Sequence, residues 1–191
     1  MSAAPVTVYD NLLASSEHAV LWAFLNQPGW SHGGYSSDQP AADRYFYKHY
    51  AGYRKSGSEP LTGEIEDELA QSAPMLANMW RGLKAGPLAG HRLARCYANG
   101  MPGGAEGGAH VDSNIPTHMT AIYYPHPVWS PDFGGETLLF NDARDEVIAA
   151  IYPRPNRLAI FSGVIPHVAR PMSRRCTDLR ITLMFKTVPA E

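Results

Sequence analysis

The second half of the chain alternates short runs of β-branched and aromatic residues with turns rich in Gly and Pro. Short apolar runs at turn-like intervals predict β-strands. We expect seven strands in this half: Leu93–Tyr97, Thr120–Tyr124, Thr137–Phe140, Glu146–Ile151, Leu158–Phe161, Val164–Ala169 and Leu179–Thr187. Seven short strands in one small domain predict a sandwich or barrel, with the helices of the first half packed on the outside of its sheets.

Apolar residues recur at helical spacing in two segments of the first half. Ser16–Leu25 carries its apolar residues in this pattern behind a serine N-cap, which predicts a helix. Pro74 opens a second apolar pattern that ends near Gly86, and proline is well suited to the first position of a helix. The acidic run Glu64–Leu69 predicts a turn of helix before it, and Val6–Tyr9 predicts a strand.

The segment Trp30–Lys55 is rich in Gly, Ser, Tyr and His, which predicts loops around one strand near Tyr45–Tyr50. Loops on a rigid scaffold often carry recognition. We therefore weigh two interpretations, a lid over a substrate and a solvated surface loop. On the first, the candidate substrate residues are Arg44, Tyr45, Tyr47 and His49.

The chain has 191 residues, of which 16 are Lys or Arg and 18 are Asp or Glu, so its net charge is −2. This length predicts one domain, residues 1–191, with helical and loop support in residues 1–90 and the β-core in residues 91–187. The balanced charge supplies no general attraction to phosphate backbones or anionic lipids, so we expect no nucleic-acid and no membrane partner. The oligomeric state is left open.

Two sequence features bear on location and redox chemistry. The longest apolar run, Ala19–Leu25, is too short to cross a bilayer, and residues 1–5 lack the basic and apolar regions of a secretory signal. We therefore expect a cytoplasmic protein. Cys96 and Cys176 lie far apart with no Cys-x-x-Cys spacing, which indicates reduced thiols and neither a zinc ribbon nor a disulfide scaffold.

A His-x-Asp triplet, His110-Val-Asp112, is the first candidate for chemistry. Residues i and i+2 of an extended segment point to the same side, so this imidazole and carboxylate can bind one cation. A second histidine from a distant strand would complete the face of two histidines and one carboxylate that is typical of non-heme Fe(II) oxygenases. The best third ligand is His167, which lies between two predicted strands.

An arginine in the last predicted strand indicates an anion site. Arg180, Thr182 and Met184 share one face of that strand, and apolar side chains share the other. A guanidinium in so apolar a strand needs an anion, and it can bind a carboxylate with two charge-assisted hydrogen bonds. Arg174 and Arg175, in a polar turn between His167 and this strand, are the alternatives to Arg180.

In order and spacing, these motifs resemble the Fe(II)/2-oxoglutarate-dependent oxygenases, and among them the prolyl-4-hydroxylase-like group. The resemblance covers half of the chain and runs through Cys96-Tyr97, His110-Val-Asp112, Ile122-Tyr-Tyr124, Gly134-Gly-Glu-Thr137, Arg157–Phe161, His167 and Arg180-Ile-Thr182. It implies a fold that is mainly β with flanking helices, namely a double-stranded β-helix or jelly roll.

The resemblance also implies the roles of the site residues. It places His110, Asp112 and His167 on Fe(II), and Arg180 on the far carboxylate of 2-oxoglutarate together with a hydroxyl from Tyr124 or Thr182. Tyr97 matches a tyrosine that lines the cosubstrate pocket in close relatives. One departure concerns spacing: Arg180 follows His167 by thirteen residues, whereas in the similar prolyl hydroxylases the basic residue follows by nine or ten.

The reaction that the resemblance implies is O2-dependent hydroxylation of an unactivated C–H bond, with release of succinate and CO2. Asp112 supports oxygenation, because the related halogenases have Gly or Ala in its place. Ascorbate is a candidate reductant. For the substrate we favour a small metabolite, such as an amino-acid-derived compound, over a peptide or protein substrate of a prolyl hydroxylase. The alternative from another class is a non-catalytic jelly-roll module that binds a metal or ligand.

Overall fold

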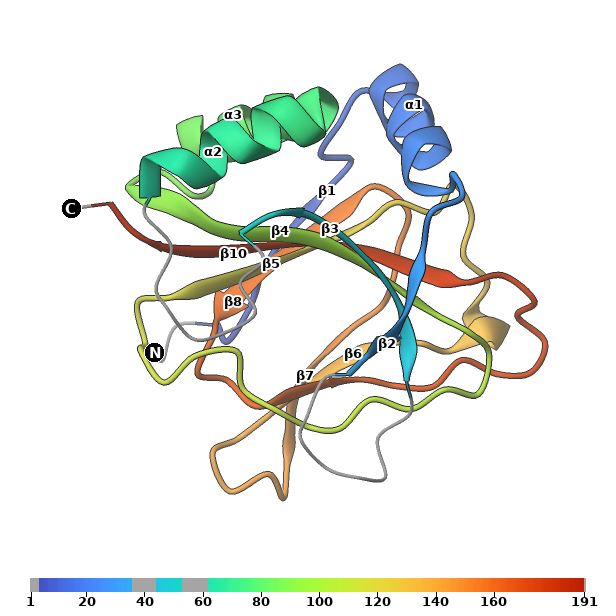
Figure 1. Cartoon of the computed structure of the whole chain (residues 1–191). Coiled ribbons are helices and arrows are strands. Elements are labelled where there is room, and N and C mark those ends of the chain that lie inside the picture. Colours follow the sequence, from blue (N-terminus) through green and yellow to red (C-terminus); the bar gives the residue numbers. More distant parts are fainter. Residues whose placement is uncertain (1–3, 36–43, 53–61, 191) are drawn as a thin grey trace.

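The computed structural model describes residues 4–35, 44–52 and 62–190 (Figure 1). The described elements, in chain order, are β1 Thr7–Asp10, α1 Ser15–Leu25, β2 Ser31–Gly34, β3 Tyr45–Ala51, α2 Thr62–Ser72, α3 Pro74–Ala85, β4 His91–Met101, β5 Met119–Tyr124, η1 Pro131–Phe133, β6 Thr137–Phe140, β7 Val147–Ile151, β8 Arg157–Ser162, β9 His167–Ala169 and β10 Arg180–Pro189. None of these helices is long and apolar enough to cross a bilayer.

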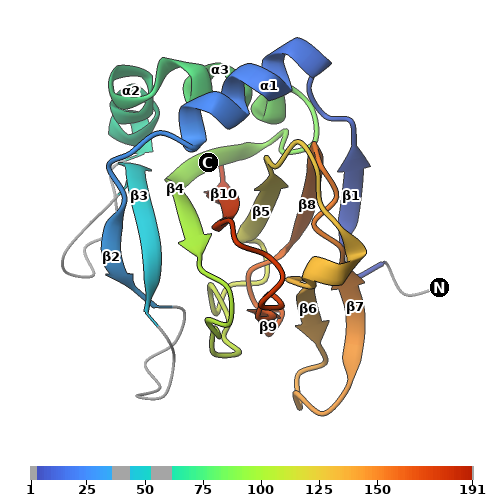
Figure 2. The same cartoon turned by 90° about the vertical axis from the view of Figure 1, so that its right-hand side faces the viewer.

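The strands form two antiparallel sheets that face each other (Figure 2). The larger sheet has the order β1-β8-β5-β10-β4-β3-β2, and the smaller has the order β7-β6-β9. This non-sequential order of strands, in two facing sheets, is that of a double-stranded β-helix. The predicted fold, mainly β with flanking helices, is therefore confirmed.

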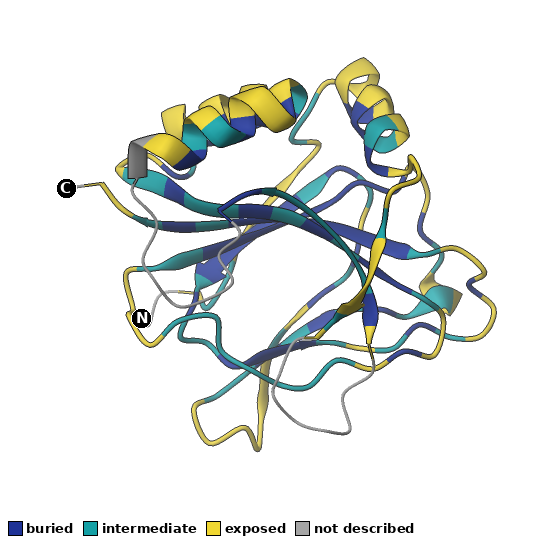
Figure 3. Cartoon of the chain, viewed as in Figure 1, coloured by how far each residue is buried: buried dark blue, intermediate teal, exposed yellow. Residues whose placement is uncertain are grey.

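The three α-helices cover the outer face of the larger sheet (Figure 1). Buried residues of α1, α2 and α3 form one apolar core with that face, and in it the rings of Trp80 and Phe185 stack with centroids 6.1 Å apart. A second, smaller core lies on the inner side of the sheet and includes Phe161 and Met184. Figure 3 shows the resulting division, with buried residues on the strands and exposed residues on the outer sides of the helices.

Three features differ from the sequence prediction. The N-cap of α1 is Ala14 and not a serine, because the helix already begins at Ser15. The single turn expected at Glu64–Leu69 is a full helix, α2, because Ile65 and Leu69 are one turn apart and both pack into the outer core. The segment Trp30–Lys55 contains two strands instead of one, since β2 pairs with β3 at the edge of the sheet. The Ser-His-Gly-Gly sequence of β2 is mostly exposed and carries no apolar alternation that could have revealed it. Of the candidate lid, residues 36–43 and 53–55 lie outside the described residues.

Candidate metal and cosubstrate site

Main-chain hydrogen bonds bring together two histidines that lie 57 residues apart in the sequence. The amide of His110 donates to the carbonyl of His167 at 3.0 Å, and the amide of His167 donates back at 2.9 Å. The amide of Asp112 donates to the carbonyl of Gly163, between β8 and β9, at 2.8 Å. The peptide backbone therefore fixes the positions from which all three side chains project.

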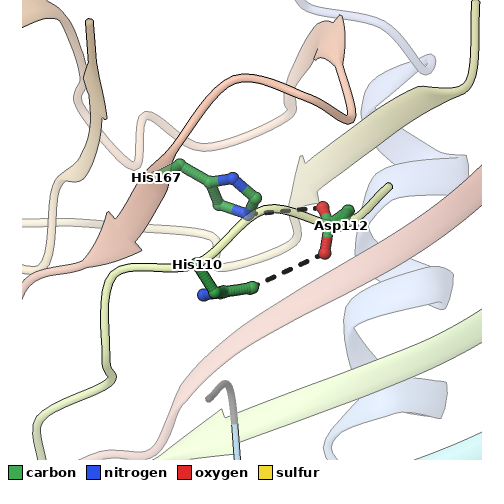
Figure 4. A group of neighbouring side chains, drawn as sticks. All are labelled: His110, Asp112 and His167. Atoms are coloured by element: carbon green, nitrogen blue, oxygen red, sulfur yellow. Dashed lines mark ion pairs between the residues drawn. The ribbon is translucent and has the colours of Figure 1, made fainter. Parts of the chain in front are cut away.

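The three side chains converge on one point between the sheets (Figure 4). One ligand atom from each of His110, Asp112 and His167 lies within 4.8 Å of the others. The Nε2 atom of His110 is 3.6 Å from Oδ1 of Asp112, and the Nε2 atom of His167 is 3.3 Å from Oδ2. Among the described residues, this is the one cluster with the arrangement of a metal site.

Hydrogen bonds at the far side of each ring determine which imidazole nitrogen is free. Nδ1 of His110 lies 2.9 Å from the carbonyl of Gly108, and Nδ1 of His167 lies 2.9 Å from the carbonyl of Ile165. Because a carbonyl can only accept, both Nδ1 atoms carry a proton, so a ring in its neutral form presents its lone pair at Nε2. Burial lowers the pKa of His167 despite the attraction of Asp112, which favours this neutral ring.

Asp112 is held as a carboxylate by two further side chains. Its Oδ2 atom accepts a hydrogen bond from Thr120 at 2.6 Å and contacts the ammonium of Lys186, which also donates to Thr120 at 3.1 Å. Burial opposes ionisation of Asp112, but the charge of Lys186 is the largest influence in the opposite direction, and the pKa lies well below its usual range. Sequence reasoning missed Lys186, although the alternation Arg180, Thr182, Met184 leads directly to it.

At the other end of the site, Arg180 is only 2% exposed. Its Nε atom donates to the carbonyl of Gly135 at 2.7 Å, and its guanidinium also donates to Oγ1 of Thr137 at 3.1 Å. No carboxylate of the described residues forms an ion pair with it. The alternatives, Arg174 and Arg175, are exposed in the turn before β10. Arg180 therefore remains the candidate anion-binding residue.

The predicted cosubstrate hydroxyls have different positions. Thr182 lines the cavity beside Arg180, whereas Tyr124 is 1% exposed and donates to Oγ1 of Thr137 at 2.9 Å. Tyr124 thus reaches Arg180 through Thr137, a residue that sequence reasoning did not select as a site residue. Tyr97 lines the same cavity.

Two adjoining cavities meet at this site. The inner cavity, of about 170 Å³, extends from the cluster of His110, Asp112 and His167 to Arg180. The outer cavity, of about 790 Å³, reaches Asp112 from the edge of the sheet and is lined by three of the predicted substrate residues, Tyr45, Tyr47 and His49.

The fourth predicted substrate residue, Arg44, is exposed and lines neither cavity. Its guanidinium lies over the ring of Tyr35, at 4.4 Å from the centroid. Arg44 therefore stands just outside the site, next to a tyrosine that does line both cavities.

Comparison with known proteins agrees with this architecture. Residues 94–185 match the model of the 2OG-Fe(II) oxygenase superfamily. The jelly-roll core is a 2OG-Fe(II) oxygenase domain. The protein is accordingly an oxygenase that uses Fe(II), 2-oxoglutarate and O2, and the alternative of a non-catalytic module is not retained. A comparison with curated protein sequences finds no significant match.

Solved structures share the fold of this oxygenase over nearly its whole length. A prolyl-4-hydroxylase from Pseudomonas putida has a TM-score of 0.64 and 17% identity, covering 98% of this chain and 94% of its own. HygX from Streptomyces hygroscopicus, solved with nickel and 2-oxoglutarate, has a TM-score of 0.65 and 10% identity, with 98% and 84% coverage. A Trichoplax adhaerens prolyl hydroxylase, bound to a hypoxia inducible factor peptide, has a TM-score of 0.64 and 20% identity, with 98% and 84% coverage.

Proposed function

We propose that His110, Asp112 and His167 bind Fe(II), and that Arg180 holds the far carboxylate of 2-oxoglutarate in the inner cavity. The substrate enters the outer cavity, where an unactivated C–H bond is hydroxylated with release of succinate and CO2. Residues 91–187 form the catalytic core in this proposal, and the preceding residues support it.

The observation that carries the proposal is the arrangement of lone pairs at the cluster. The Nε2 atoms of the two histidines face the two oxygens of one carboxylate at 3.6 and 3.3 Å. Lone pairs in such an arrangement repel each other unless a cation lies among them. Two imidazoles and one carboxylate suit Fe(II) and leave coordination positions open for other ligands. When bound, the iron supplies the oxidising chemistry, with 2-oxoglutarate and O2 as its cosubstrates.

The residues of the chain position the reactants. Thr120 and Lys186 fix the carboxylate of Asp112, and the carbonyls of Gly108 and Ile165 fix the two rings. Such supporting contacts typically change metal affinity or activity by about 10–100-fold. Arg180, held by Gly135 and Thr137, orients a dicarboxylate along the inner cavity, whose volume is below the usual 300–1,000 Å³ of sites for larger ligands.

A small metabolite is the substrate class that we favour. The outer cavity of about 790 Å³ falls within the range of small-molecule sites. The alternative is a peptide, as in the Trichoplax adhaerens complex of similar fold. Mass spectrometry distinguishes the two: a 16 Da gain on proline-containing peptides, at rates that exceed those for free amino-acid derivatives, would overturn the preference for a small molecule.

The direct test of the site is 2-oxoglutarate consumption with Fe(II), O2 and ascorbate as reductant. We expect succinate production by the wild-type protein and none above background by His110→Ala. The matched control is His32→Ala, which removes an exposed imidazole on β2. Full activity of His110→Ala would contradict the ligand assignment, and absence of succinate from the wild-type protein would contradict the proposed function.

A further inference from the structure

Two cations lie directly opposite each other in the larger sheet. Lys186 on β10 is the register partner of Arg95 on β4, and on its other side Lys186 is the partner of Thr120 on β5. Both Lys186 and Arg95 line the inner and the outer cavity. Like charges in directly opposed positions destabilise a sheet unless an anion compensates them.

Within the described residues, only one of these two cations has a carboxylate as its partner. Lys186 contacts the carboxylate of Asp112. For Arg95 there is no such partner: one terminal nitrogen lies 3.3 and 3.4 Å from the two ring nitrogens of His49, and the guanidinium lies over the ring of Tyr97 at 4.4 Å from its centroid. Its Nε atom is buried and makes no hydrogen bond. A buried donor without an acceptor is costly, so Arg95 lacks a partner that would satisfy it.

Arg95 lies far from the proposed cosubstrate site at Arg180. Lys186 is six residues from Arg180 along β10, which corresponds to about 20 Å in a strand. The inner cavity therefore has a cation at each end, Arg180 at one and the pair Arg95 and Lys186, beside Asp112 of the metal cluster, at the other. The second end opens into the outer cavity, in which we place the substrate.

We propose that Arg95, together with Lys186, binds an oxyanion group of the substrate, either a carboxylate or a phosphate. This inference rests on the proposed function, because it assigns the Arg180 end to 2-oxoglutarate. The guanidinium suits the role, since its planar fork binds two oxygens at once while its face stays packed on an aromatic ring. The substrate class is thus an anionic small molecule whose reacting carbon lies between this anchor and the metal cluster.

The test uses acetate and inorganic phosphate as probes. Each is titrated calorimetrically, without O2, into the Fe(II)-loaded protein saturated with 2-oxoglutarate, so that the Arg180 end is filled. We expect at least one probe to bind, and Arg95→Gln to weaken it by about tenfold or more, because charge-assisted hydrogen bonds are lost. Tighter acetate binding indicates a carboxylate substrate, and tighter phosphate binding a phosphorylated one. Arg81→Gln, an equal charge change on the exposed side of α3, leaves both affinities unchanged.

Two further variants keep the test decisive. Arg95→Met retains the packing on Tyr97 and removes the charge, so it replaces the glutamine variant if that variant does not fold; Arg95→Lys restores part of the affinity. The proposal is overturned if neither anion binds the wild-type protein, or if both uncharged variants bind the anion with the affinity of the wild-type protein. It is also overturned if a higher concentration of 2-oxoglutarate weakens binding of the anion. Failure of the proposed function is a separate result, seen as no binding of 2-oxoglutarate to the metal-loaded wild-type protein.

Discussion

The two faces of β10 perform different tasks with alternate residues of one strand. Ile181, Leu183 and Phe185 point outward into the core beneath the helices, and all three are nearly inaccessible to solvent. Arg180, which begins the strand, and Lys186 line the cavities on the inner side. The outer face of this strand supplies apolar burial that stabilises the fold, so the inner face can carry buried charges beside the cavities.

The charged groups of the inner face lose hydration when they are buried, whereas the apolar outer face has no such energetic cost. Burial lowers the pKa of both Arg180 and Lys186, because a charged group loses hydration inside the barrel. Each is retained by polar contacts with Thr137, Gly135 or Asp112. Substitutions on the outer face should therefore change stability, and substitutions on the inner side should change ligand binding.

The largest expected effect is on the inner side. His167→Ala removes a proposed metal ligand, and we expect succinate production to fall by at least ~1000-fold, beyond the 10–100-fold typical of residues that only support ligands. Thermal unfolding of the metal-free protein should change little by comparison. Fe(II)-dependent turnover above one tenth of the wild-type rate would show that His167 is not a ligand.

The next largest effect is expected on the outer face of β10, where substitutions should change stability. Phe185→Ala leaves a cavity against Trp80 and should lower the free energy of unfolding by about 3–5 kcal/mol, measured by urea denaturation. Phe185→Leu should cost much less, because it fills most of the volume. At temperatures where the variant is folded, its affinity for 2-oxoglutarate should equal that of the wild-type protein. A specific loss of that affinity would mean that the two faces are coupled.

A pH dependence of stability should come from His126, which supports the outer face. Its Nε2 atom accepts a hydrogen bond from the amide of Ile181 at 2.8 Å, and burial, followed by the charge of Arg180, lowers its pKa to about 4. The unfolded chain takes up this proton near pH 6.5, before the folded protein does. The histidine therefore destabilises the fold as the pH falls from 6.5 toward 4, by up to roughly 3 kcal/mol.

The measurement for His126 is the free energy of unfolding between pH 4 and pH 7 in the wild-type protein and in His126→Gln. The variant should show a smaller slope over this interval, because it cannot take up the proton. Equal slopes would mean that His126 does not contribute to acid destabilisation.

The smallest expected effect is at the cosubstrate end of the inner face. Arg180→Gln should weaken 2-oxoglutarate binding by about 30-fold, since it removes a charge-assisted pair while some polar contacts remain. Arg175→Gln is the matched control, because Arg175 is exposed and should leave the affinity unchanged. Calorimetric titration of the metal-loaded proteins measures both, and equal affinities would show that Arg180 is not the anchor.

The sequence by itself determined the elements whose patterns are local. The alternation along β10 indicated which side chains share the face of Arg180, and the His110-Val-Asp112 triplet indicated two groups for one cation. The mainly β fold followed from the spacing of turns and apolar runs. Period-two alternation and short motif spacings survive folding because they depend only on the geometry of one strand.

Only the tertiary structure decided what depends on register and on contacts distant in sequence. Lys186 lies opposite Arg95 because the register of β10 and β4 runs unbroken from Arg180 to Lys186 and shifts only after it, and no local pattern predicts this alignment of the two strands. The carbonyls that select the imidazole tautomers come from loops fixed by the bridge between His110 and His167. The sequence indicated which groups form the site. Their pairing depends on how strands from both halves of the chain align, and that alignment is set by the sum of many packing contacts.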